Sequence, residues 1–201
     1  ISIEGNLDID AGTLNNRGDS LFISGTVDQS GGTFTQTTGG IRVNGTYTHS
    51  GGTFTGAAGP LDFNSTYTQT GGSFSVGASD ISIDGAIALS GTGTLNANTA
   101  GTFTMGSTYT QTDATSTFVG GAGDIDLDDP FSVTDGAFTS CSGTFDFSAA
   151  TWTLNAAASA AFVANGGTII FTDGTDITVS LGANTTFNNV TINMTSGNAN
   201  N

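Results

Sequence analysis

The hydrophobic residues of this chain recur at fixed places within blocks of about twenty residues. Each block opens on two apolar residues separated by one other residue, and single apolar residues follow near places seven and fourteen. Alternation with a period of two is typical of strands, so each block is predicted to hold three short strands rather than a helix. The opening pairs of the first five blocks are Ile1/Ile3, Leu21/Ile23, Ile41/Val43, Leu61/Phe63 and Ile81/Ile83.

Glycines separate the predicted strands. A single glycine stands at place five of most early blocks, and a pair follows at places eleven and twelve, as in Gly31-Gly32 and Gly51-Gly52. Glycine takes positive φ without steric cost, so these positions suit sharp corners. Three strands and three corners per block predict one coil, here called a rung, of an all-β parallel β-helix, or β-solenoid. Connections between parallel strands are usually right-handed, so a right-handed helix is expected.

A repeat this short cannot bury its own apolar face, so each rung must stack on its neighbours. Stacking is expected to align Phe34, Phe54 and Phe74 in one aromatic column. Strand spacing and about nine to ten rungs predict a rod roughly 45 Å long. The later rungs are expected to start at Phe103, Ile125, Phe145, Ile169 and Val190.

The pattern predicts a single β-solenoid domain over residues 1–201. Regular rungs are expected in 1–100, and looser rungs with corner insertions in 101–189. A last rung is expected to start in 190–201 and to pass into a polar tail. The alanine-rich segment 155–165 is compatible with a short helical turn, or with a strand that uses Phe162 and Val163.

The first and last predicted rungs carry apolar residues of the same kind as the interior rungs. Uncovered strand edges invite further strands, so we expect either a piece of a longer solenoid or copies that meet head to tail in a filament. The chain opens on Ile1 without a signal-peptide pattern, which suits a processed product or a fragment. The predicted assembly residues are Ile1, Ile3, Leu7 and Leu14 at one end, with Phe187, Val190, Ile192 and Met194 at the other.

The charge balance is strongly acidic. The chain has seventeen Asp and Glu residues but only two basic residues, Arg17 and Arg42, so its formal net charge is −15. Such a surface repels nucleic acid and anionic lipid, so neither is expected as a partner. The chain has no long apolar stretch, so membrane insertion is not expected either. An acidic, soluble surface is taken to indicate an extracellular or cell-surface location.

The sequence contains no recognisable catalytic constellation. His49 is the only histidine, and it stands where neighbouring blocks carry Gln29 and Gln69, which indicates a polar corner residue rather than a base. Paired acid and base groups, as glycan hydrolysis requires, are not evident. Cys141 is the only cysteine, and its small neighbours favour a buried thiol over a disulfide between subunits. We therefore expect neither an enzyme nor a bound cofactor.

One acidic cluster raises the question of calcium. Asp126, Asp128 and Asp146 are expected on one outer side of adjacent rungs, and carboxylate oxygens are the ligands that Ca²⁺ prefers. The local sequence resembles a nonapeptide calcium repeat, but Ile125 stands where that repeat needs aspartate. A solvated acidic edge is the alternative to a weak calcium site.

Outward threonines suggest a different use of the rod. Thr-x-Thr pairs stacked at strand spacing resemble the flat faces of ice-binding β-solenoids, although threonine is also an ordinary outward strand residue. The array weakens to Thr13/Asn15 and Thr94/Asn96. Its best part comprises Thr33, Thr35, Thr53, Thr55, Ser73 and Ser75.

Units of the type IxVxGTYTxSGGTFT, with the closing TFNNVTIN, resemble the repeat regions of secreted bacterial surface proteins of the filamentous-haemagglutinin and adhesin kind. This resemblance implies secretion, a right-handed parallel β-helix and attachment or scaffold work, and it supplies no catalytic residue. The expected function is an extracellular filament subunit that binds its own copies head to tail, or an adhesin stalk that carries a surface glycan or another cell-surface ligand. Ice binding is the first alternative, and a polysaccharide-binding or polysaccharide-cleaving β-helix is the second.

Overall fold

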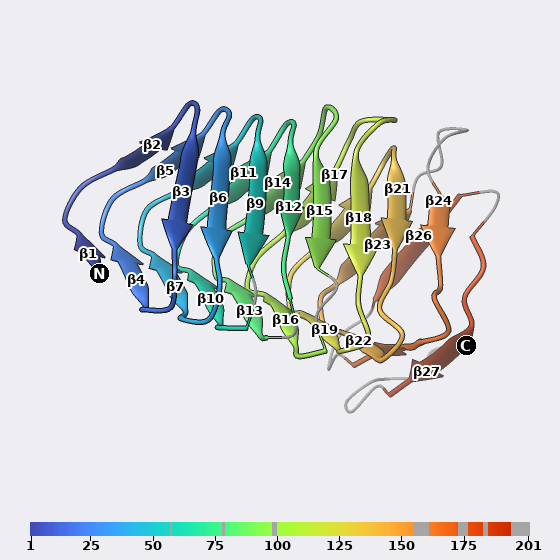
Figure 1. Cartoon of the computed structure of the whole chain (residues 1–201). Helices are drawn as coiled ribbons and strands as arrows, with labels where there is room; N and C mark the ends of the chain where they lie inside the picture. The colour runs from blue at the N-terminus through green and yellow to red at the C-terminus, as the bar shows by residue number, and fades with distance from the viewer. Residues whose placement is uncertain are drawn as a thin grey trace.

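The computed structural model describes residues 1–56, 58–77, 79–97, 100–154, 161–172, 177–182 and 185–193. Within these ranges the chain is all-β, and each rung gives one strand to each of three parallel sheets. The rungs follow one another along a single axis, and the chain turns as a right-handed coil (Figure 1). The fold is a β-solenoid of about 9 turns with ~20 residues per turn, as the repeat pattern predicts.

The three sheets run the length of the rod, with ten, nine and eight strands among the described residues. Sheet A contains β1 (Ser2–Ile3), β4 (Leu21–Ile23), β7 (Ile41–Val43), β10 (Leu61–Phe63), β13 (Ile81–Ile83), β16 (Phe103–Met105), β19 (Ile125–Leu127), β22 (Thr144–Phe147), β25 (Thr168–Phe171) and β27 (Asn189–Ile192). Sheet B contains β2 (Leu7–Ile9), β5 (Val27–Gln29), β8 (Tyr47–His49), β11 (Tyr67–Gln69), β14 (Ile87–Leu89), β17 (Tyr109–Gln111), β20 (Phe131–Val133), β23 (Thr151–Leu154) and β26 (Thr178–Leu181). Sheet C contains β3 (Thr13–Asn16), β6 (Thr33–Gln36), β9 (Thr53–Gly56), β12 (Ser73–Ser75), β15 (Thr94–Ala97), β18 (Thr117–Gly120), β21 (Ala137–Thr139) and β24 (Ala161–Val163).

Equivalent residues lie directly over one another from rung to rung. In sheet C, Phe34 pairs in register with Phe54, and Phe54 pairs with Phe74. The Phe34 and Phe54 rings meet edge to face at 5.1 Å, whereas the Phe54 and Phe74 rings are stacked at 4.2 Å. All three side chains are fully buried. The aromatic column that was predicted from the repeat is therefore confirmed.

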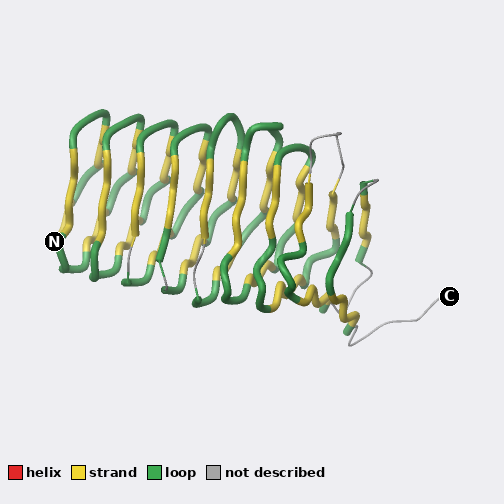
Figure 2. The backbone as a smooth tube through the Cα atoms, turned by 45° about the vertical axis from the view of Figure 1, so that its right-hand side comes forward, coloured by secondary structure: helices red, strands yellow, loops and turns green. Residues whose placement is uncertain are grey.

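Alternation along each short strand separates the core from the surface. In β7, for example, Ile41 and Val43 are buried while Arg42 between them is exposed. The inward side chains of the three sheets form one continuous hydrophobic core, because neighbouring rungs repeat the same inward places. Figure 2 shows short strands joined by compact loops at the three edges of the rod. The later rung starts Phe103, Ile125, Phe145, Ile169 and Val190 all lie in sheet A, as expected.

The glycine pairs form tight corners between sheets B and C. Gly32, Gly52 and Gly72 have φ values of 60°, 77° and 68°, which L side chains rarely adopt. A Cβ atom on Gly72 would lie 2.7 Å from the carbonyl oxygen of Gly52, because the corners of successive rungs are stacked in contact. Both the backbone conformation and the lack of space therefore require glycine at these places.

Two parts of the later rungs refine the expectations from sequence. Residues 155–160 of the alanine-rich segment lie outside the described residues, so the predicted helical turn is not tested there. Phe162 and Val163 belong to β24, which pairs with β21, so the strand alternative holds for them. Trp152 is fully buried and pairs with Phe131 in sheet B, where it takes the seventh place of its rung. The altered spacing around Trp152 concealed this place in the sequence.

Candidate functional site

The N-terminal end of the rod presents the edges of all three sheets. In the described part of the chain, the strands β1, β2 and β3 each pair with one neighbour, namely β4, β5 and β6. Ile1 is 65 % exposed, whereas Ile3, Leu7 and Leu14 are partly buried against the core. The structure therefore places the four predicted assembly residues together at one end of the described chain.

The C-terminal end is more apolar than the sequence pattern indicated. Val190 and Ile192 of β27 are exposed, Ile192 to 72 %. Val179 and Leu181 of β26 are exposed beside them, and these two residues were not predicted as part of this face. Their signal was the alternation in Thr-Val-Ser-Leu, which follows a corner of irregular length.

A hollow of about 310 Å³ opens on this end between Phe171, Ile177, Val179 and Ile192. Phe187 packs inward, with its ring 5.4 Å from Phe162 and edge to face. The predicted Met194 lies outside the described residues. An apolar face of this kind can bury further strands, because both its backbone edge and its side chains match the interior rungs.

The threonine array lies on the outer face of sheet C. Thr33, Thr53, Ser73, Thr94 and Thr117 form one column in register, and Thr35, Thr55, Ser75 and Asn96 form a second. Their side chains are exposed or half-buried while the phenylalanines between them point inward. The second column ends at Val119, and the first passes into Ala137. The predicted array therefore exists as two regular columns over a limited stretch of the rod.

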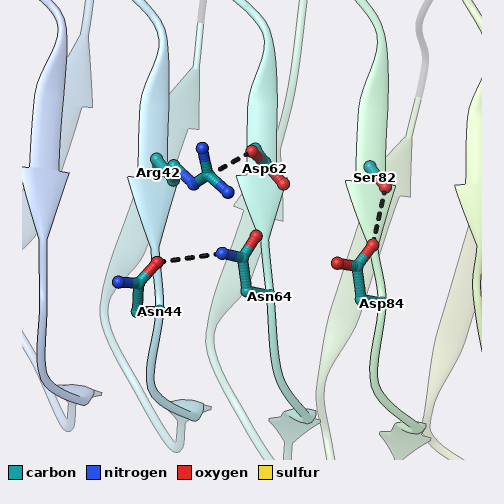
Figure 3. A network of polar contacts seen from close by, with 6 residues as sticks. All are labelled: Arg42, Asn44, Asp62, Asn64, Ser82 and Asp84. Atoms are coloured by element: carbon teal, nitrogen blue, oxygen red, sulfur yellow. Dashed lines mark hydrogen bonds and ion pairs between the residues drawn. The ribbon is translucent and has the colours of Figure 1, made fainter.

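The outer face of sheet A carries a network of charged and amide side chains (Figure 3). Nε of Arg42 lies 3.4 Å from a carboxylate oxygen of Asp62 on the next rung. When the Asn64 amide is oriented to satisfy its neighbours, its oxygen accepts from the Arg42 guanidinium and its nitrogen donates to Asp62, both at 3.0 Å. Farther along the sheet, the hydroxyl of Ser82 donates to Asp84 at 3.2 Å.

This network adjoins a shallow hollow of about 460 Å³ on the same face, lined in part by Phe22, Gly40, Arg42 and Pro60. Arg42 interacts with Asp62 and Asn64 of the next rung, so the network links neighbouring rungs. Ion pairs and hydrogen bonds between exposed side chains contribute at most about 1 kcal/mol each to stability, so the network stabilises the rod only slightly.

The acidic cluster lies where it was predicted, but two of its carboxylates accept hydrogen bonds from side chains of neighbouring rungs. Asp126 and Asp146 are register neighbours on β19 and β22, and Asp128 directly follows the last residue of β19. Asp128 accepts a hydrogen bond from Ser148, and Asp146 accepts one from Thr172. Among the described residues, no group of three or more side chains is arranged to hold a metal ion. The donor set therefore gives no support to the expected weak calcium site.

The carboxyl group of Asp126 has a perturbed pKa. Its pKa is raised, first by desolvation and then by the charges of Asp128 and Asp146. The direction is the one expected for a partly desolvated carboxyl group beside other carboxylates.

The two other candidate reactive groups lie inside the rod. His49 is 0 % exposed at the end of β8, where no substrate can reach it. Cys141 is a buried free thiol, and desolvation raises its pKa, which makes it a poor nucleophile. Both placements agree with the structural roles that the sequence indicated, although His49 is an interior residue rather than a surface corner.

Comparison of the chain with protein families, curated proteins and solved structures found no match. The described part of the chain contains no helix that is long and apolar enough to span a membrane.

Proposed function

We propose that this chain is an extracellular structural rod that assembles end to end by rung stacking, as a filament subunit or as the stalk of an adhesin. The observation that carries the proposal is the like-on-like register of all three sheets, in which the first and last strands pair on one side among the described residues. A strand edge satisfies its backbone groups by adding another parallel strand.

A second copy of the chain is the occupant that fits best. The N-terminal face offers Ile1 and Ile3 at the same places of sheet A that Val190 and Ile192 occupy at the other end. Stacking these faces would bury Ile192 and Leu181 and continue the core ladders. Such a contact is heterologous and does not close on itself, so it propagates as a filament.

The acidic surface supports an extracellular rod that stays separate from its neighbours. A net charge of −15 spread along the sides disfavours lateral association, whereas the two ends carry the exposed apolar side chains. Growth along the axis is then favoured over sideways aggregation.

The test is polymer formation by the purified chain, followed by sedimentation over a range of concentrations and by electron microscopy. Ile192→Lys places a charge on the apolar end and is expected to abolish polymers without loss of fold, because this side chain is already exposed. Thr104→Lys adds the same charge to the outer face of sheet A in the middle of the rod and is expected to leave polymerisation unchanged. A chain that remains monomeric at high concentration contradicts the filament and leaves the stalk.

Ice binding is a second candidate, favoured by the two in-register columns of hydroxyl groups on sheet C. Their methyl and hydroxyl groups repeat at the rung spacing of about 4.8 Å, which offers water a regular template. Faceted ice crystals are expected in solutions of the chain near freezing. Thr55→Lys should remove this effect, whereas Thr68→Lys on sheet B should preserve it. Smooth, unshaped crystals with the unmodified chain would dismiss this candidate.

A further inference from the structure

Polar residues take the last inward place of sheet B in four rungs, with Leu89 between the third and the fourth of them. They are Gln29, His49, Gln69 and Gln111, and each is 0 % exposed. Register pairs His49 directly with Gln29 on one side and with Gln69 on the other. Histidine therefore stands between two glutamines at a place that Ile9, Leu89 and Val133 fill in other rungs.

Glutamine satisfies this position with both ends of its amide. The Gln69 nitrogen donates to the carbonyl oxygens of Gly71, Gly72 and Thr94 at 3.0–3.2 Å, while its oxygen accepts from the Tyr67 hydroxyl at 3.0 Å. In the sixth rung, the Gln111 oxygen likewise accepts from Tyr109 at 2.8 Å. The buried tyrosine and the corner carbonyls are both paired by a single side chain.

His49 does not reproduce this pattern. Among the described residues, neither of its ring nitrogens forms a hydrogen bond of good geometry, although both are buried and the carbonyl groups of Gly51 and Gly52 act on the ring. The tyrosine of its own rung, Tyr47, donates instead to Gln29 of the preceding rung at 2.8 Å. Burying a polar group without a hydrogen bond is destabilising, so the third rung is expected to be weaker at this place than the glutamine rungs.

The surroundings of His49 are neutral. Its ring lies 6.2 Å from those of Tyr47 and Phe74, and desolvation keeps the pKa of Tyr47 and of Tyr67 well above the ordinary value. The charged residues on the strands packed around it are Asp28 on β5, Arg42 on β7 and Asp62 on β10, and all three occupy outward places of their strands. No described contact offers a carboxylate to an imidazolium at this position.

Desolvation lowers the pKa of His49, and the carbonyl groups of Gly52 and Gly51 offset part of this effect. The open rung therefore binds more protons than the closed rung at pH values below the ordinary histidine pKa of about 6.5. Stability is insensitive to His49 above that pH and falls as the pH drops below it. The sign of the linkage is that acid favours opening.

We propose that His49 is an acid-operated weak point, at which protonation of the buried imidazole opens the third rung while the glutamine rungs stay closed. In the closed rung the carbonyl groups of Gly51 and Gly52 offset only part of the cost of burying an imidazolium, which is hydrated once the corner between β8 and β9 separates. Acid would thereby interrupt the three backbone ladders at one defined place along the rod.

Hydrogen exchange of backbone amides tests this proposal in the intact chain. The Ser50 and Thr53 amides donate to carbonyls of the preceding rung and report opening of the third rung, whereas the Thr112 and Thr117 amides report the sixth. Exchange is compared at pH 7.5 and pH 5.0 after correction for the intrinsic effect of pH. Linkage permits an increase in third-rung opening of up to about 30-fold at pH 5.0, with no matching increase in the sixth rung.

Two variants and one direct titration make the result decisive. His49→Gln is expected to remove the selective response of the third rung, and it also controls for titration of the carboxylates. Gln111→His, combined with His49→Gln, is expected to move the response to the sixth rung. NMR titration of the His49 imidazole in the unmodified chain is the independent measurement. A His49 pKa at or above 6.5, or an unchanged acid response in His49→Gln, would overturn the proposal.

Discussion

Single residues in this rod are constrained by the rung above and the rung below as much as by their own neighbours in sequence. Gly52 illustrates the point, because its φ of 77° and the carbonyl groups of Gly31 and Gly32 both act against any side chain. Gly12 has the same φ but open space around it, and Gly5 has open space without a positive φ. The three glycines thus separate conformational strain from steric contact.

Replacement of these glycines by alanine should therefore give a graded series of stabilities. Gly5→Ala is expected to leave the free energy of unfolding nearly unchanged, and Gly12→Ala to lower it by about 1 kcal/mol through strain alone. Gly52→Ala should lower it by clearly more, because a Cβ atom there would displace the stacked corner. Urea unfolding followed by circular dichroism measures all three. Equal stabilities for Gly12→Ala and Gly52→Ala would contradict the role assigned to corner contact.

At the scale of strands, much of the architecture follows from the periodic positions of apolar residues. The places of Phe34, Phe54 and Phe74 predicted sheet C and its register, because a slip of one residue would turn every such side chain toward water. Sheet A could likewise be followed to Val190 through rungs of unequal length.

The same reasoning failed where spacing or pairing is not periodic. Trp152 and Val179 follow corners of irregular length, so their places in sheet B were not recognised. The missing hydrogen bonds of His49 depend on the reach of a buried amide, which a residue pattern does not encode. The engagement of Asp128 and Asp146 by Ser148 and Thr172 was hidden for the same reason.

The whole molecule behaves as a stack of equivalent coils, so one coil should be removable. Deletion of residues 41–60 joins Gly40 to Leu61 and brings Leu61 into the place over Leu21 that Ile41 occupies. We expect a folded rod that is shorter by about 4.8 Å and somewhat less stable, because one layer of core is lost. Small-angle scattering and thermal unfolding measure these two changes. Deletion of residues 41–50 breaks the register and serves as the control that should not fold.

The like-on-like register also has a consequence for how such a chain changes over generations. Tandem segments that encode interchangeable rungs can be gained or lost by unequal recombination. Gain or loss of a whole number of rungs keeps equivalent residues in register in all three sheets. The number of rungs therefore sets the length of the rod, in steps of about 4.8 Å, and the packing contacts between rungs stay the same.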